Sequence, residues 1–383
     1  MTALAPRRTQ PPAPRRTGRV FLAGAFGQGN PGDEALLAAF GRALRDHSPV
    51  AASTDPGGTT AAHGIAAVGR DDLSRVARTI ARADAVVVAG GTIFKALHPS
   101  CGRAPLSLLR RTAAVAGVSK AMRKPLALVG VGAAPLHGQT ARMLARGIVR
   151  AADLLVLRDE EAAAHLAAVG AKSPFRVGAD AAWTLVPDPP AGAHAGPVVV
   201  ALSHLAGGRE LADRLAAGLQ PVLDAGIPLR LDPWQPDGDA ALAAAVVSRL
   251  GDRVQLAPPP ADLLAARTGM LGARLVLAQR FHALVAAASA GVPALAVAHE
   301  PKLAGLARRL DQPAVAADAP PVTLSSAVLS ALDAAPPSPA AVRRERASAE
   351  DGFRLLRVLL ARGRSEEAVD VDGLALRPEE WLG

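Results

Sequence analysis

The chain has 383 residues, and 43 Lys and Arg against 34 Asp and Glu give it a formal net charge of +9. A single cysteine, Cys101, excludes an internal disulfide framework and a cysteine-rich zinc site. The start is rich in Pro and Arg and lacks the apolar core of a secretory signal. These features predict a cytoplasmic protein of two domains, with a disordered basic arm over residues 1–17.

The positive charge suits an anionic substrate, and it leaves room for peripheral contact with the inner face of a membrane. Nucleic acid is disfavoured as a partner. Aromatic residues make up only 3% of the chain, and no dense Lys/Arg stripe is interleaved with them as base stacking would require.

From residue 19 onward, short apolar runs of β character alternate with amphipathic helical stretches. The strands expected in the first half lie at residues 19–26, 50–53, 85–89, 126–129 and 154–157. Such alternation is typical of parallel βαβ units. The segment 187–197, PDPPAGAHAGP, interrupts every periodic signal and is therefore predicted to be a linker.

After the linker the alternation restarts, with expected strands at residues 198–205, 228–232, 253–257, 275–279 and 293–298. The predicted fold is α/β, with two doubly wound, Rossmann-like domains at residues 18–186 and 198–335 facing each other across a cleft. Residues 336–383 contain a last expected helix, at about 339–360, which can cross back onto the first domain, and a polar tail.

The loop after the first strand reads GQGNPGDE and carries Gly27, Gly29 and Gly32 at Gly-x-Gly-x-x-Gly spacing. Glycines at such a turn let the backbone approach a ligand closely. However, Asp33 and Glu34 open the next helix, where they complement its dipole and would repel a diphosphate. We therefore favour a site for sugar hydroxyls over a dinucleotide site. A plain tight turn with an acidic helix start is the alternative.

Two further glycine turns are expected after strands of the first half, at Gly90-Gly91-Thr92 and at Gly130-Val131-Gly132. The carboxyl ends of strands in an open α/β sheet point at the ligand crevice, so the three turns predict one shared site. Each turn alone is equally well explained as a tight connection.

Arg158 follows another expected strand, and acidic residues open the helix after it. Its guanidinium can bind an anion bidentately. Pairing with Asp159 or Glu161 on the surface is the alternative.

The second half contains LVLAQRFHALVAAASAGVPALAVAHEPKLAGLARRL. Arg280 and His282 stand where a strand turns into a helix, and the next strand delivers Glu300 and Lys302 to the adjacent loop. We expect Arg280, His282 and Lys302 to converge on one surface at the strand ends. The two cations can neutralise an anionic substrate, and histidine can transfer a proton near neutral pH.

Four elements in this order resemble the polysaccharide pyruvyltransferase family: AFGQGNPGDEALL, AGGTIF, GVGAAPL with LRDEEA, and QRFHALVAAASAGVPALAVAHEPKLAGL. The resemblance implies a glycosyltransferase-B-like fold and transfer of the pyruvyl unit of phosphoenolpyruvate onto a sugar, giving a pyruvate ketal and phosphate. The family's Arg-x-His motif, associated with phosphoenolpyruvate, falls on Arg280 and His282. Lys302 matches its Pro-Lys position, and Arg158 its Arg-Asp strand end.

The chemistry of phosphoenolpyruvate agrees with this assignment. Its carboxylate and phosphate would be neutralised by Arg280, Lys302 and Arg158, and its methylene carbon would be protonated by His282 as general acid. The Asn30–Glu34 loop is expected across the cleft, holding a sugar or lipid-linked glycan acceptor through Asp33 or Glu34. We expect no metal and no cofactor besides phosphoenolpyruvate as co-substrate.

The sequence departs from the family pattern in its reduced glycine triplet, in Lys95 where an acidic residue is usual, and in one missing glycine of GVGAAPL. These departures concern the acceptor more than the donor. Two alternatives stay open: a nucleotide-sugar glycosyltransferase of the same architecture, in which Glu300 would bind a ribose, and a non-catalytic glycan-binding protein.

Overall fold

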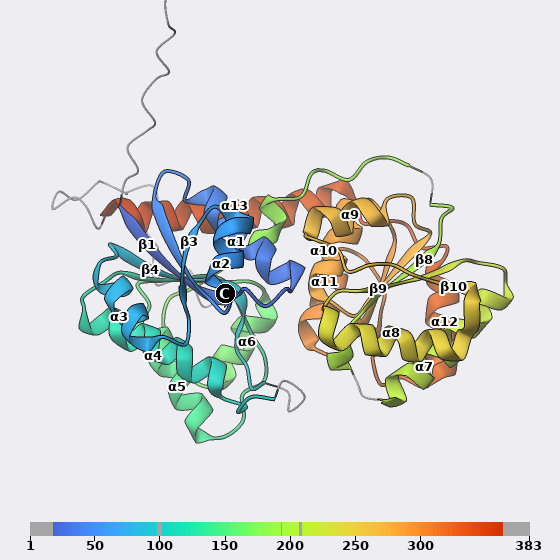
Figure 1. The fold of residues 1–383 in the computed structure, drawn as a ribbon, viewed down its shortest axis with the longest axis horizontal. Coiled ribbons are helices and arrows are strands. Elements are labelled where there is room, and N and C mark those ends of the chain that lie inside the picture. Colours follow the sequence, from blue (N-terminus) through green and yellow to red (C-terminus); the bar gives the residue numbers. More distant parts are fainter. Residues whose placement is uncertain (1–17, 98–101, 193, 207–208, 363–383) are drawn as a thin grey trace, which may run out of the picture.

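The computed structural model describes residues 18–97, 102–192, 194–206 and 209–362. In this part of the chain, two α/β domains lie side by side, each with helices on both faces of a parallel sheet (Figure 1). The predicted α/β fold with two Rossmann-like domains is therefore confirmed. The basic arm expected at residues 1–17 and the tail beyond residue 362 lie outside the described residues.

The sheet of the N-terminal domain has seven strands in the order β3-β2-β1-β4-β5-β6-β7. The strands are β1 Arg19–Phe26, β2 Ser48–Ser53, β3 Ala66–Gly69, β4 Ala85–Phe94, β5 Leu126–Ala133, β6 Leu154–Leu157 and β7 Arg176–Val177. The helices are α1 Pro31–Ala43, α2 Pro56–His63, α3 Leu73–Ala81, α4 Ser107–Ala121, α5 Gln139–Ala151, α6 Glu160–Ala168 and the 3-10 turn η2 Ala181–Thr184.

The C-terminal sheet has six strands in the equivalent order β10-β9-β8-β11-β12-β13. The strands are β8 Val198–Leu202, β9 Leu229–Pro233, β10 Val254–Leu256, β11 Leu275–Ala278, β12 Ala294–Ala298 and β13 Ala314–Ala316. The helices are α7 Arg209–Asp224, α8 Pro236–Leu250, α9 Leu263–Met270, α10 Phe281–Ser289, α11 Pro301–Arg309, α12 Pro321–Ala331 and α13 Pro339–Arg362, with 3-10 turns η3 His204–Ala206 and η4 Gly251–Arg253.

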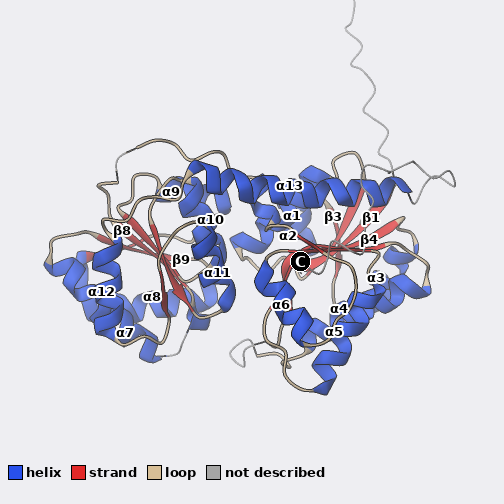
Figure 2. Ribbon diagram, turned by 180° about the vertical axis from the view of Figure 1, so that it is seen from behind, coloured by secondary structure: helices blue, strands red, loops and turns tan. Residues whose placement is uncertain are grey.

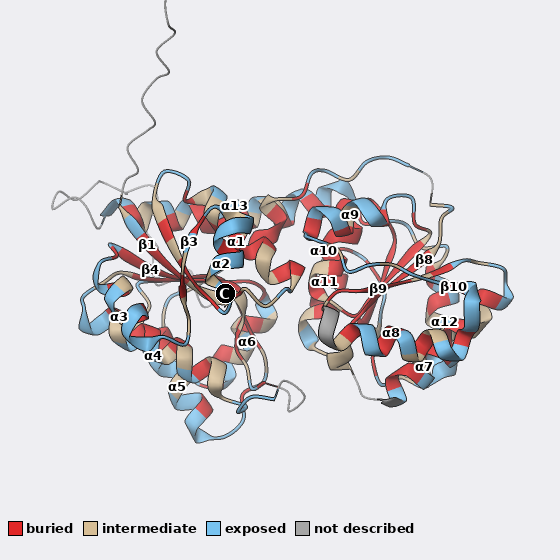
Figure 3. Cartoon of the chain, viewed as in Figure 1, coloured by how far each residue is buried: buried red, intermediate tan, exposed pale blue. Residues whose placement is uncertain are grey.

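The central strands read as continuous Val, Leu and Ala because helices cover both of their faces (Figure 2). All eight residues of β5 and all five of β8 are buried. The burial colouring shows buried strands in the middle of each domain and exposed helix faces on the outside (Figure 3). Several helices begin at an Asn or Asp whose side chain accepts a backbone N–H of the first turn, such as Asn30 before α1 and Asp159 before α6.

The last helix, α13, packs against β5, β6 and η2 of the N-terminal domain, and the two ends of the described chain thus meet in one domain. The ring of Phe353 meets the ring of Phe40 edge to face, with centroids 4.9 Å apart. Arg346 on α13 pairs with Asp188 at 2.7 Å and also donates to the carbonyl of Val186. These contacts hold the start of the connection between the two sheets against α13.

The expected glycine turns after β4 and β5 are wrong in one respect: both motifs lie inside the strands. Gly90 and Gly91 have φ of 68° and 76° within β4, which continues to Phe94, and Gly130 has φ of 68° within β5. A positive φ kinks a strand without ending it, and the β4–β5 and β5–β6 registers shift beside these residues.

Candidate functional site

A cavity of about 1090 Å³ lies between the domains, at the carboxyl ends of β1, β4, β8, β11 and β12. In each sheet the strand order reverses at the central pair, β1 with β4 and β8 with β11, which is where open α/β sheets bind ligands. The predicted site residues on its wall are Asn30, Asp33, Gly90, Gly91, Thr92, Arg158, Arg280, His282, Glu300 and Lys302. Gly27, Gly32, Glu34 and Gly132 lie outside the wall.

His282 lies in the first turn of α10 and contacts the other domain. Its Nε2 is 3.4 Å from Oδ1 of Asp180, a carboxylate with no solvent exposure. Burial alone would raise the pKa of Asp180, but the facing His282 and the guanidinium of Arg158 hold it below its ordinary value. Asp180 is thus a charged neighbour that can fix the orientation of the imidazole.

Gly32 provides space for His282 rather than a contact to a ligand. A Cβ on Gly32 would overlap Nδ1 of the imidazole. The ring packs against Gly32 beside Nδ1, and its Nε2, which has no hydrogen-bond partner among the described residues, lies near Asp180. Both neighbours belong to the N-terminal domain. The role of the third motif glycine is steric.

Arg280 directly precedes α10 and is held on three sides. Its Nε donates to the carbonyl of Leu202 at 2.8 Å, and its Nη2 donates to Asp239 at 2.5 Å and to Oε1 of Gln235 at 3.1 Å. Burial alone would raise the pKa of Asp239, but Arg280 and backbone N–H donors hold it below its ordinary value. The guanidinium is therefore fixed in a single orientation at the cavity wall.

Arg158 is buried, with 2% of its surface exposed, so the expectation of a surface pair with Asp159 or Glu161 is wrong in its location. Its Nε donates to Asp159 at 2.7 Å, and its guanidinium lies 4.4 Å from the ring centre of Phe281 in the other domain. Nη2 has no hydrogen-bond partner among the described residues. Gly132 leaves the space that this guanidinium occupies.

Two lysines share the carboxylate of Glu300. Lys302 contacts one oxygen of Glu300, and Lys95, at the end of β4 in the other domain, donates to the second at 3.2 Å. Burial lowers the pKa of Lys302 to about 8, although Glu300 opposes the shift. Burial would raise the pKa of Glu300, but the two lysines hold it well below its usual range. Lys302 and Glu300 are therefore both charged at neutral pH.

The two acidic residues in the first turn of α1, Asp33 and Glu34, have different surroundings. Asp33 faces the cavity, and burial raises its pKa although the positive charges of His282 and Lys302 oppose the shift. Glu34 points elsewhere: its oxygens accept from the backbone N–H of Gly27 at 2.8 Å and contact Nε2 of His63 at 2.9 Å. Both oxygens of Glu34 serve the loop itself and Glu34 lies outside the cavity wall, so of the two acidic residues predicted to contact an acceptor sugar the structure places Asp33 at the cavity.

The cavity has a second, more apolar branch beneath the N-terminal sheet, between α3 and α4. Burial, together with the nearby charges of Arg111 and Arg103, lowers the pKa of Arg70 at the end of β3. Arg111 is paired with Asp71 at 2.7 Å. The apolar lining of this branch comes from Phe21, Leu73, Val76, Ala77, Ile80, Val88, Leu108 and Val115.

Sequence reasoning missed several residues of the site, namely Asp180, His204, Gln235, Asp239 and His299. Burial lowers the pKa of His299 to about 4, so this imidazole is neutral near pH 7. In the described part of the chain, no group of three or more His, Cys, Asp or Glu residues is arranged to hold a metal ion. Within the same residues, no helix is long and apolar enough to cross a membrane.

Two Rossmann-like domains around a ligand cavity define the glycosyltransferase-B-like class of folds, and solved structures agree. The Staphylococcus aureus MnaA–UDP complex has a TM-score of 0.61 at 14% identity, over 90% of this chain and 95% of that one. The UDP-GlcNAc 2-epimerase of Methanocaldococcus jannaschii has a TM-score of 0.59 at 14% identity, over 90% of this chain and 99% of that one. The structure of Anabaena Alr3699/HepE in complex with UDP-glucose has a TM-score of 0.58 at 14% identity, over 91% of this chain and 98% of that one.

Comparison of the sequence with family models identifies the family, which similarity of fold alone does not. The model of the family described as polysaccharide pyruvyl transferase matches residues 30–301, so the chain belongs to that family. The resemblance drawn from the four motifs is thereby confirmed. No curated protein matches the chain.

Proposed function

We propose that this protein transfers the pyruvyl group of phosphoenolpyruvate onto two hydroxyls of a sugar in a cell-surface polysaccharide or its precursor, forming a ketal and releasing phosphate. The observation that carries the proposal is the meeting of Arg158, Arg280, Lys302 and His282 on one cavity wall, in a chain of this family. Cationic groups fixed in advance can neutralise the carboxylate and phosphate of the donor without reorganising.

In the first step, a sugar hydroxyl oxygen would bond to C2 of phosphoenolpyruvate while His282 gives its proton to the methylene carbon C3. In the second step, the bond from C2 to the phosphate oxygen breaks and a second hydroxyl oxygen takes its place. Asp180 would hold the imidazole in orientation and stabilise its charged form. Phosphoenolpyruvate is the co-substrate, and the proposal uses no other cofactor.

The acceptor would lie on the N-terminal side of the cavity, with Asp33 facing its hydroxyls. Asn30 would act through Asp33, because its Nδ2 donates to that carboxylate at 2.9 Å. The apolar branch between α3 and α4, with the nearby Arg70 and Arg111, supports a glycan carried on an anionic lipid. Such an acceptor would bring the protein to the inner face of a membrane as a peripheral partner. The proposed macromolecular substrate is therefore a glycan. The protein itself is proposed to be cytoplasmic.

The test is calorimetric titration of the protein with phosphoenolpyruvate and, separately, with UDP. We expect saturable binding of phosphoenolpyruvate that is lost in Arg280→Ala and kept in Arg75→Ala, an exposed arginine on α3. Binding of UDP alone would replace this proposal with a nucleotide-sugar glycosyltransferase. That alternative requires Glu300 to bind a ribose, but both oxygens of Glu300 already pair with lysines.

A further inference from the structure

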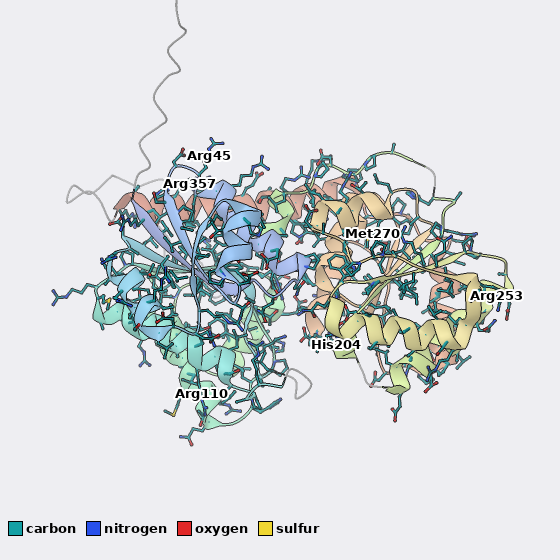
Figure 4. The ribbon with its side chains drawn as sticks, viewed as in Figure 1. Arg45, Arg110, His204, Arg253, Met270 and Arg357 are labelled. Atoms are coloured by element: carbon teal, nitrogen blue, oxygen red, sulfur yellow. The ribbon has the colours of Figure 1, made fainter. Side chains whose placement is uncertain are left out.

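The cavity holds a second histidine supported by a buried carboxylate. His204 lies in η3, directly after β8, and at the edge of the C-terminal domain that faces the cleft (Figure 4). Its Nδ1 is 2.7 Å from Oδ1 of Asp239, and 30% of its side chain is exposed. Asp239 itself has no exposed surface. His204 therefore pairs one ring nitrogen with the protein and keeps part of its ring accessible.

A glycine makes room for His204 as one does for His282, but of the two imidazoles only that of His204 is hydrogen-bonded to its aspartate. A Cβ on Gly238 would overlap the imidazole of His204, just as a Cβ on Gly32 would overlap that of His282. The backbone N–H of His204 also donates to Oδ1 of Asp239, at 2.9 Å. Each histidine thus has a buried aspartate near one ring nitrogen and a glycine that leaves room for the ring.

The partner of His204 determines which nitrogen carries the proton. Asp239 accepts hydrogen bonds from Arg280 and from the backbone N–H groups of Trp234 and Gln235, so it is an ionised acceptor. Nδ1 of a neutral His204 must then carry the hydrogen that it donates to this carboxylate. Nε2 is left with a free lone pair, which is the requirement for a base.

From this arrangement we propose that His204 is a second catalytic residue, the general base that removes the proton from the attacking hydroxyl of the acceptor. The inference rests on the proposed pyruvyl transfer. That reaction needs a base, because two hydroxyls lose their protons while C3 gains only one.

The protons balance with two histidines. In the first step the hydroxyl proton passes to Nε2 of His204, the oxygen bonds to C2, and His282 protonates C3. In the second step the neutral His282 accepts the proton of the second hydroxyl as its oxygen bonds to C2. The phosphate leaves with the electron pair of the C2–O bond and takes the proton from His204. Both residues return to their starting states.

The position of His204 next to the donor site is part of the inference. Asp239 binds His204 through Oδ1 and Arg280 through Oδ2, so one carboxylate sets the distance between the base and a cation assigned to phosphoenolpyruvate. A merely structural His204 would act only by holding Asp239 and Arg280 in place. The experiment has to separate these two roles.

The conservative variant is His204→Asn, whose amide can still donate to Asp239 but cannot act as a base. Phosphate release from phosphoenolpyruvate is measured with p-nitrophenyl glycosides of glucose, galactose and mannose as acceptor probes. We expect His204→Asn to lose about 10²–10⁴-fold in turnover, with the Kd for phosphoenolpyruvate unchanged. His137→Asn, at an exposed histidine outside the cavity wall, should match the wild type.

A second variant, His204→Ala, tests the chemistry directly. Added imidazole should restore part of the turnover of His204→Ala, because imidazole can replace a missing base. It should not restore the turnover of Arg280→Ala, because it cannot replace the guanidinium that binds the donor. Long-range ¹H–¹⁵N spectra of the wild type should show the proton of His204 on Nδ1.

The outcomes are separable from those of the proposed function. Turnover of His204→Asn within threefold of the wild type, or a proton found on Nε2, would overturn the role of His204 and leave pyruvyl transfer standing. A wild type that fails to bind phosphoenolpyruvate would overturn the proposed function, and this inference with it.

Discussion

Replacing Gly32 with alanine should separate the activity of this protein from its stability. Gly32 lies in the first turn of α1 with an ordinary negative φ, so its backbone suits alanine. In a helix, alanine is more favourable than glycine by about 1 kcal/mol. The added methyl would, however, overlap Nδ1 of His282, and the imidazole is the group that can move.

The displaced imidazole is expected to lose its alignment with Asp180, which is already 3.4 Å away. A general acid contributes about 10²–10⁴-fold to a rate, and a misplacement of about 1 Å can cost about 10²-fold. We therefore expect Gly32→Ala to lose about 100-fold in turnover, or about 2.7 kcal/mol of transition-state stabilisation. The midpoint of thermal unfolding should stay close to that of the wild type.

The assay is phosphate release from phosphoenolpyruvate, run beside a thermal unfolding curve. Gly117→Ala is the matched control, because Gly117 lies in helix α4 and a Cβ there would meet nothing within 4 Å. Turnover of Gly32→Ala within threefold of the control would refute the steric role of Gly32. A large loss of stability would refute the claim that His282, and not the backbone, yields to the methyl group.

Three further predictions follow from the same structure. Asp180→Asn should lower turnover by about 10-fold or more while leaving the Kd for phosphoenolpyruvate unchanged, because it removes a charge facing His282 and none from the donor's cations. Binding of phosphoenolpyruvate should weaken as the pH rises through about 8, where Lys302 loses its proton, and calorimetry of Lys302→Met should lack this dependence. Phe353→Ala should cost about 3–5 kcal/mol of unfolding free energy, measured in urea, because it removes the buried ring that meets Phe40.

The sequence predicted the arrangement of elements because buried parallel strands and amphipathic helices leave strong local patterns. The bounds of β1 agree with those expected, and α10 begins at the predicted strand-to-helix corner. Lys302, expected in a loop, lies in the first turn of α11. The place of Arg280 and His282 at the corner between β11 and α10 was predicted in the same way, since a strand-to-helix corner has a local signature. The glycine motifs of β4 and β5 were misread as turns, because sequence does not distinguish a glycine that kinks a strand from one that ends it.

The supporting carboxylates could not be found by such reasoning. Asp180 lies in a loop of the first domain, 102 residues before His282, and meets it only because the domains close on each other. Asp239 is in helix α8, and its links to His204 and Arg280 depend on the arrangement of β8, β9 and β11. Long-range pairs of this kind leave no periodicity along the chain.

The candidate site is built from residues of both domains, and this affects which reactions can compete with the proposed transfer. Arg158 meets Phe281, Lys95 meets Glu300 and His282 meets Asp180 across the same boundary. Opening the cleft would separate all three pairs at once, so a donor held by one domain would face an incomplete set of groups. In the proposed pyruvyl transfer, water would compete with the acceptor hydroxyl for the donor. Because the groups assigned to the donor come together only when both domains are in place, the proposed reaction would activate phosphoenolpyruvate only in this arrangement, which would limit its hydrolysis.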